Sequence, residues 1–194
     1  DLVSLRPVLN EWIKIHEKYL IQYEYEDCLY WYNERANLSA FAGAVWKMGG
    51  FALEEYSSEK GDEENRKNGR VDLYFSLGEF EAIVEAKAGK LYFGGKTKLD
   101  LKEKIDRIVD KSVEDVAKSF PVYPHGIGLG LSFISTYWRS DYDASQDMLE
   151  LKSYLENSYG ENIKESGRSY ELAFYSLFES DRNITSALDN HHNA

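Results

Sequence analysis

Apolar residues recur at steps of three and four along several stretches of this chain, which is the spacing of one helix face. These stretches predict helices at 8–23, 27–48, 100–120 and 144–159. Short runs rich in β-branched and aromatic residues predict strands at 51–56, 69–77, 81–87, 126–134 and 169–178. Gly78 and its polar neighbours separate the second strand from the third, as a tight turn would.

The second and third predicted strands carry charged residues in an unusual place. Side chains alternate along a strand, so Asp72 shares one face with the even positions to Ser76, while Val71 shares the other with the odd positions to Leu77. On the third strand the same rule places Glu85 and Lys87 together. Lysine and carboxylate side chains are rarely buried unless they are paired or bind a metal. Two carboxylates and one lysine are therefore expected to converge.

The helix predicted at 27–48 has a gap in its apolar stripe. Steps of three and four from Trp31 reach position 34, which is a glutamate, before the stripe resumes at Leu38. A carboxylate on a buried face is costly unless it has a cationic partner or a metal. Glu34 is therefore either a metal ligand or the partner of an arginine such as Arg70. Gly49-Gly50 then ends the helix.

Asp72 followed by Glu85-Ala86-Lys87 resembles the active-site signature of the PD-(D/E)xK, or restriction-endonuclease-like, phosphodiesterase superfamily. Val71 stands where the signature often has proline. The resemblance implies an α/β fold with an αβββαβ core, in which a mixed central sheet is flanked by helices. That core would cover about 27–135, with the aspartate on the second strand and Glu-x-Lys on the third. One helix and one strand would be added after it.

The same resemblance implies a metal-dependent nuclease. An endonuclease acting on DNA is the expectation, but the sequence does not distinguish DNA from RNA or endonuclease from exonuclease action. The Mg²⁺ of such a nuclease, which Mn²⁺ can replace, would be held by Asp72, Glu85, Glu34 and the main-chain carbonyl of Ala86. A divalent cation lowers the pKa of a bound water and stabilises charge on phosphoryl oxygens. Lys87 would position the attacking water and neutralise charge in the transition state.

The size and composition of the chain fit one domain. Its 194 residues are enough for one substantial core, with 1–26 as a helical lead-in and 183–194 as a polar tail. No apolar run is long enough for a membrane span, and residues 1–7 lack the pattern of a signal peptide. With Cys28 as the single cysteine, these features predict a cytoplasmic protein.

The charge is unfavourable for a nucleic-acid partner at long range. The net charge is −11, from 23 basic and 34 acidic residues, although the window from Lys87 to Arg107 is +4. Within that window, the candidates for phosphate contacts or base stacking are Lys90, Lys96, Lys98 and Tyr92. A lysine-rich solvated loop is an equally good interpretation. Two further expectations concern exposure: His16 at the surface, and 91–95 as a flexible segment with exposed aromatic residues.

A second class of function stays open. An acidic protein of this fold could be a non-catalytic binding module, such as a DNA mimic, an inhibitor or an assembly subunit. Lys87 would then form ion pairs with Asp72 and Glu85 without a metal. The oligomeric state stays open: cleavage of both DNA strands by a domain with one site would require two copies, as in a homodimer, and the acidic surface is compatible with a protein partner that supplies affinity for DNA.

Overall fold

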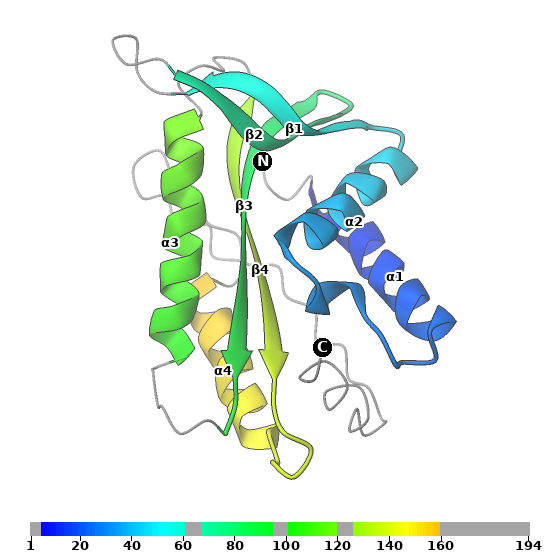
Figure 1. Cartoon of the computed structure of the whole chain (residues 1–194), viewed down its shortest axis with the longest axis vertical. Helices are drawn as coiled ribbons and strands as arrows, with labels where there is room; N and C mark the ends of the chain where they lie inside the picture. Colours follow the sequence, from blue (N-terminus) through cyan, green and yellow to red (C-terminus); the bar gives the residue numbers. More distant parts are fainter. Residues whose placement is uncertain (1–4, 61–66, 95–100, 120–125, 160–194) are drawn as a thin grey trace.

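The computed structural model describes residues 5–60, 67–94, 101–119 and 126–159 (Figure 1). The elements in chain order are α1 (Arg6–Gln22), the 3₁₀ helix η2 (Leu29–Trp31), α2 (Glu34–Lys47), β1 (Phe51–Lys60), β2 (Lys67–Leu77), β3 (Phe80–Tyr92), α3 (Leu101–Ser119), β4 (Ile127–Tyr137) and α4 (Ser145–Tyr159). The predicted strand at 169–178 and the polar tail lie outside the described residues.

The strands form one mixed sheet in the order β1-β2-β3-β4. The pairs β1-β2 and β2-β3 are antiparallel, and β3-β4 is parallel. A parallel pair needs a crossover connection, and α3 is the helix between these two strands. Helices α1 and α2 lie on one side of the sheet, whereas α3 and α4 lie on the other (Figure 1). The chain is therefore an α/β fold with helices packed on a four-stranded sheet.

Strand β3 is buried on both faces from Ala82 to Ala86, because helices cover both sides of it there. Ala82, Val84 and Ala86 belong to the core cluster that includes residues of α1 and α2. On the opposite face, Ile83 packs with Val116 of α3. The side chains that alternate with the apolar set therefore point toward α3, and Glu85 and Lys87 are among them.

The predicted alternation of faces along β2 fails at Asp72. Leu73 and Phe75 pack with the α1–α2 core, as the pattern predicts. Val71 was expected on the same face, but it packs instead with Ile83 and with Val116 of α3. The strand thus changes the face that it presents between Val71 and Leu73. Asp72 lies at that change.

The predicted helix at 27–48 is too long at its N-terminal end. Helix α2 begins at Glu34, because the side chain of Asn33 accepts a hydrogen bond from the Ala36 N–H at 3.1 Å and caps the helix. The segment before it contains η2 instead. Glu34 is consequently the first residue of the helix and not an interruption inside its apolar stripe. At the other end Gly49, with a φ of 83°, follows the helix as expected.

One expectation about exposure is wrong, and a second is confirmed for one of its two aromatic residues. His16 is fully buried, with its ring 4.3 Å from that of Trp12. The segment after Lys87 remains a strand as far as Tyr92, which is exposed, whereas Phe93 is buried. Among the described residues, no helix has the length and apolar character that a membrane crossing requires.

We predict that Gly130→Ala will destabilise the fold by about 1 to 3 kcal/mol, because added volume in a packed site forces neighbouring atoms to move. A Cβ at Gly130 would lie 2.7 Å from Ser112 Oγ and 3.0 Å from the Ser112 main-chain carbon. Gly43→Ala in α2 is the matched control. Its Cβ would meet only Ile15 Cδ1, at 3.8 Å, so the better helix former should stabilise by up to about 1 kcal/mol. Urea unfolding of both variants measures the difference, and equal midpoints would contradict the tight α3–β4 contact.

We also predict that acid destabilises this protein partly through His16. Burial lowers the pKa of His16 to about 4 from its usual 6.5. The unfolded chain therefore binds a proton that the folded chain rejects, and stability contributed by the neutral ring is lost as pH falls from about 6.5 toward 4. The loss should reach at most about 3 kcal/mol. His16→Leu should flatten the stability profile in this window, and parallel profiles for the two proteins would exclude this role.

Candidate active site

The site is located where β2 and β3 separate. Their paired register covers Leu77–Phe80 through Leu73–Val84. Beyond that point β3 continues alongside β4 as far as Tyr92, so the main-chain groups on its other edge lie outside the β2 pairing. A buried main-chain N–H needs an acceptor, and side chains supply acceptors here.

Asp72 supplies the first acceptor. Its Oδ2 accepts a hydrogen bond from the Ala86 N–H at 2.7 Å, and the side chain is half-buried. The carboxylate therefore continues the β2–β3 contact after main-chain pairing stops. This bond fixes Asp72 against the middle residue of the Glu-x-Lys sequence.

Glu34 supplies the second acceptor from the first turn of α2. Its Oε2 accepts a hydrogen bond from the Ala88 N–H at 3.1 Å. The N–H groups of alternate strand residues point to the same edge, so the donors Ala86 and Ala88 place both carboxylates along one edge of β3. The helix and the two strands are thus brought together as the sequence predicts. Arg70, the alternative partner for Glu34, pairs instead with Glu55 of β1 at 2.6 Å.

Lys87 bridges this edge and helix α3. Its Nζ donates to the main-chain oxygen of Ala86 at 2.7 Å and forms an ion pair with Asp115 Oδ2 at 3.1 Å. The Ala86 carbonyl, expected as a metal ligand, therefore receives an ammonium group here. Within the described residues, the ion pair of Lys87 is with α3 and not with Asp72.

Glu85 lies on the α3 side of β3. Its side chain is buried, with 4% of its surface exposed, and its Oε1 accepts a hydrogen bond from Ser119 Oγ at 2.6 Å. Glu85 and Lys87 thus share a face as predicted, but Glu85 faces a hydroxyl of α3, whereas Asp72 and Glu34 lie along the strand edge. The described residues contain no group of three or more His, Cys, Asp or Glu side chains arranged to hold a metal ion.

The other three members of the predicted quartet nonetheless act electrostatically on Glu34. Burial raises the pKa of Glu34, and the charges of Asp72 and Glu85 raise it further. Lys87 and the Ala88 N–H act in the opposite direction. Each member of the quartet therefore affects the ionisation of Glu34. Two carboxylates and a main-chain carbonyl are hard oxygen donors, which suit Mg²⁺, an ion that often uses few protein ligands and keeps several waters.

Sequence reasoning missed two residues of α3 that contact this site, Asp115 and Ser119. A signal was present in the helix pattern, because Ser112 and Ser119 occupy buried positions between apolar ones. Polar residues on the buried stripe of a helix indicate polar partners on the surface that it covers. Ser112 also has a polar partner on the sheet, because its Oγ accepts a hydrogen bond from Ser132 Oγ at 3.1 Å.

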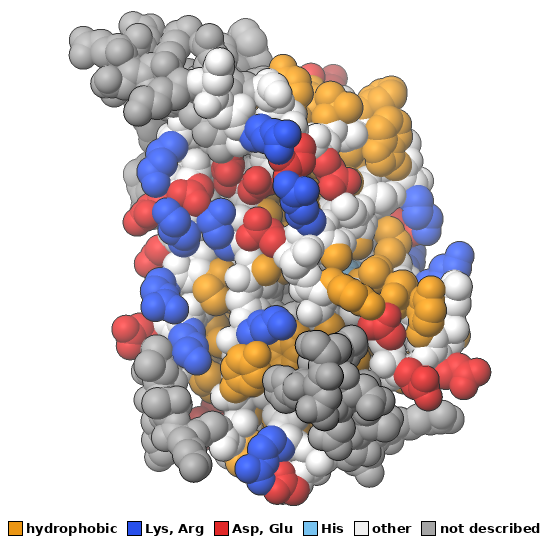
Figure 2. Space-filling view, viewed as in Figure 1, with side chains coloured by type: hydrophobic (Ala, Val, Ile, Leu, Met, Phe, Trp, Pro, Cys, Tyr) orange, Lys and Arg blue, Asp and Glu red, His pale blue; other side chains and the backbone are white. Residues whose placement is uncertain are grey.

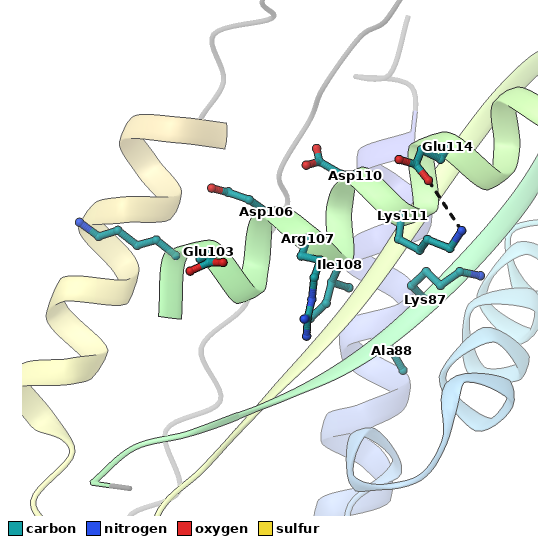
Figure 3. A pocket seen from close by; sticks show the side chains of 10 residues that line it. Lys87, Ala88, Glu103, Asp106, Arg107, Ile108, Asp110, Lys111 and Glu114 are labelled. Atoms are coloured by element: carbon teal, nitrogen blue, oxygen red, sulfur yellow. Dashed lines mark ion pairs between the residues drawn. The ribbon is translucent and has the colours of Figure 1, made fainter. Parts of the chain in front are cut away.

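A groove of about 760 Å³ extends from Lys87 along α3 (Figure 3). Lys102, Arg107 and Lys111 line it together with acidic residues of the same helix, so its walls carry both signs of charge. Figure 2 shows the same mixture of basic and acidic side chains on this face. The ammonium groups of Lys87 and Lys111 lie close together, since both contact Asp115 (Figure 3).

Two of the residues predicted to contact nucleic acid, Tyr92 and Lys90, lie within the described part of the chain. Tyr92 is 57% exposed and stacks on Tyr137, with 5.4 Å between ring centroids. The ammonium group of Lys90 lies over the other partner of that stack, 5.3 Å from the Tyr137 centroid. Lys96 and Lys98 lie outside the described residues.

Comparisons with family models, with curated proteins and with solved structures found no match to this chain.

Proposed function

We propose that this protein is a metal-dependent nuclease that hydrolyses phosphodiester bonds in nucleic acid, with DNA as the expected substrate. One observation carries the proposal. On one edge of β3, Asp72 accepts a hydrogen bond from the Ala86 N–H, and Glu34 accepts one from the Ala88 N–H. Lys87, the residue between Ala86 and Ala88, places its ammonium group on the Ala86 carbonyl. This arrangement brings two carboxylates and one ammonium group together at residues 86–88 of β3.

The order of elements supports a restriction-endonuclease-like core. Helix α2, strands β1 to β3, helix α3 and strand β4 follow the order αβββαβ, and the sheet is mixed. Asp72 is on the second of these strands, Glu85-Ala86-Lys87 is on the third, and Glu34 is on the helix that precedes them. Helix α4 is the expected addition after the core.

Asp72 and Glu34 are the carboxylates that would hold Mg²⁺ or Mn²⁺, whereas the Ala86 carbonyl, expected as a further ligand, contacts the Lys87 ammonium group instead. Glu85, the remaining expected ligand, accepts a hydrogen bond from Ser119 on the α3 side. When bound, the cation would lower the pKa of a water and neutralise charge on the phosphoryl oxygens. The contribution of the protein is to fix these oxygen donors on a strand edge that is itself held by main-chain hydrogen bonds.

Lys87 would supply the second cationic group. Its side chain is about one quarter exposed, so the ammonium group is accessible while it remains anchored to Ala86 and Asp115. A positive charge fixed in advance stabilises negative charge that develops on the phosphate without reorganisation. Lys87 is therefore assigned the roles of water positioning and charge neutralisation.

The net charge of −11 favours a second candidate, a non-catalytic binding module on the same fold. In that case the hydrogen bonds at the β3 edge would have a purely structural role. The two candidates differ in cation binding and in phosphodiester cleavage, so both properties are measured below.

We predict that calorimetric titration with Mn²⁺ or Mg²⁺ will show binding to the parent protein and that Asp72→Asn will abolish it. The asparagine side chain can still accept the Ala86 hydrogen bond, so the variant removes charge while it preserves the local contact. A thermal melt of both proteins checks that the fold is retained. A parent protein that gives no heat of binding would favour the non-catalytic module.

We predict metal-dependent cleavage of DNA that Lys87→Ala lowers by about 100-fold or more, as the loss of one electrostatic group in an active site does. Linear, supercoiled and single-stranded DNA are incubated with the protein and Mg²⁺. Lys14→Ala on α1 is the control, because Lys14 is 67% exposed and pairs with Glu11. Equal cutting by the parent, the control and Lys87→Ala would show that the activity comes from a contaminant.

A further inference from the structure

Lys87 does not form the ion pair with Asp72 that the sequence pattern suggests. A lysine beside several carboxylates ordinarily neutralises them, and the charges of Lys87 and Asp72 both reach Glu34. Within the described residues, however, the ammonium group of Lys87 pairs with Asp115 of helix α3, which covers the face of β3 opposite to α1 and α2. Asp72 and Glu34 are instead satisfied by main-chain N–H groups.

Asp115 is itself held in place. Its Oδ2 contacts Lys87, and its Oδ1 contacts Lys111 at 2.9 Å and Lys118 at 3.2 Å. Lys111 and Lys118 lie one turn before and one turn after Asp115 on the same helix. Burial alone would raise the pKa of Asp115, but the hydrogen bonds from Lys111, Lys87 and Lys118 outweigh it and hold that pKa well below the usual range. Asp115 is therefore a fixed anion on a rigid element.

This arrangement has a consequence for cation binding. The lysine side chain is a flexible chain of four methylene groups, so an ammonium group without its helix partner is free to pair with the carboxylates at the strand edge. Such a pair would compete with a divalent cation for the same oxygens. Asp115 holds the ammonium group on the α3 side, and at the strand edge that group contacts the Ala86 carbonyl and not the carboxylates of Asp72 and Glu34.

We propose that Asp115 is a positioning residue, which anchors the Lys87 ammonium group on α3 so that Asp72 and Glu34 stay open to a divalent cation. The proposal rests on the proposed metal-dependent function of the same site. It assigns to α3 a part in the site that the Asp and Glu-x-Lys pattern does not contain.

Mn²⁺ affinity of the full chain tests the proposal. Asp115→Asn should weaken Mn²⁺ binding by about 10- to 100-fold, the usual effect of losing a partner that orients a site residue. Asp115→Glu, which can still reach Lys87, should recover most of that loss. Asp110→Asn is the matched control, because it removes the same charge from an exposed position on the same helix and should leave the affinity unchanged. Equal affinities of Asp115→Asn and Asp110→Asn would overturn the proposal.

A second readout separates this proposal from the proposed function. In the metal-free protein, a ¹H–¹⁵N spectrum selective for lysine ammonium groups reports on Lys87, whose signal is assigned by its absence from Lys87→Arg. Asp115→Asn should shift this signal and speed its hydrogen exchange, and Asp110→Asn should do neither. A shifted signal in a protein that binds no Mn²⁺ would refute the metal site but support the anchoring of Lys87. An unchanged signal would refute the anchoring, whatever the metal does.

Discussion

The separation of β2 from β3 is the constraint on which the rest of this site depends. Main-chain pairing covers Leu73–Val84, and β3 then continues beside β4 alone. The N–H group of the buried Ala86 needs an acceptor at that edge, because a buried donor without one would cost free energy, and the N–H group of the exposed Ala88 has an acceptor as well. Asp72 and Glu34 are these two acceptors. The same hydrogen bonds that complete the sheet therefore place two carboxylates side by side on its edge.

Helix α3 gives the other half of the site its geometry. Ser119 donates to the buried Glu85, and Asp115 pairs with Lys87, so both charged residues of the Glu85-Ala86-Lys87 sequence have partners on this helix. A lysine and a glutamate two residues apart on one face would otherwise have to neutralise each other or the edge carboxylates. The helix thus separates the charges into an acidic strand edge and an anchored ammonium group. This separation would allow the proposed cation site and the proposed phosphate-neutralising role of Lys87 to coexist.

The parts of the fold that follow from local patterns could be predicted closely. The helices at α3 and α4 and the strand β4 have strong periodicity or apolar runs, and Gly78 marks the β2–β3 turn. The errors fall where a local pattern competes with a specific hydrogen bond or with packing. Because Asn33 caps α2, the helix begins seven residues later than the predicted helix. His16 is buried although it lies off the predicted apolar stripe. Neither effect has a strong signature in hydrophobic spacing, because a cap depends on one side chain and burial of a histidine depends on its neighbours.

The sequence by itself determined which residue types are available and how far apart they lie on their elements. It placed Asp72 on one strand, Glu85 and Lys87 on the next, and Glu34 on a helix, although within its apolar stripe and not at its first residue, because strand and helix periods are local properties of the backbone. Only the tertiary structure decided which oxygen each N–H receives, that Val71 and Leu73 face opposite sides, and that Lys87 pairs with Asp115. These contacts join elements distant in sequence, and they depend on strand register and helix packing, which no local pattern specifies.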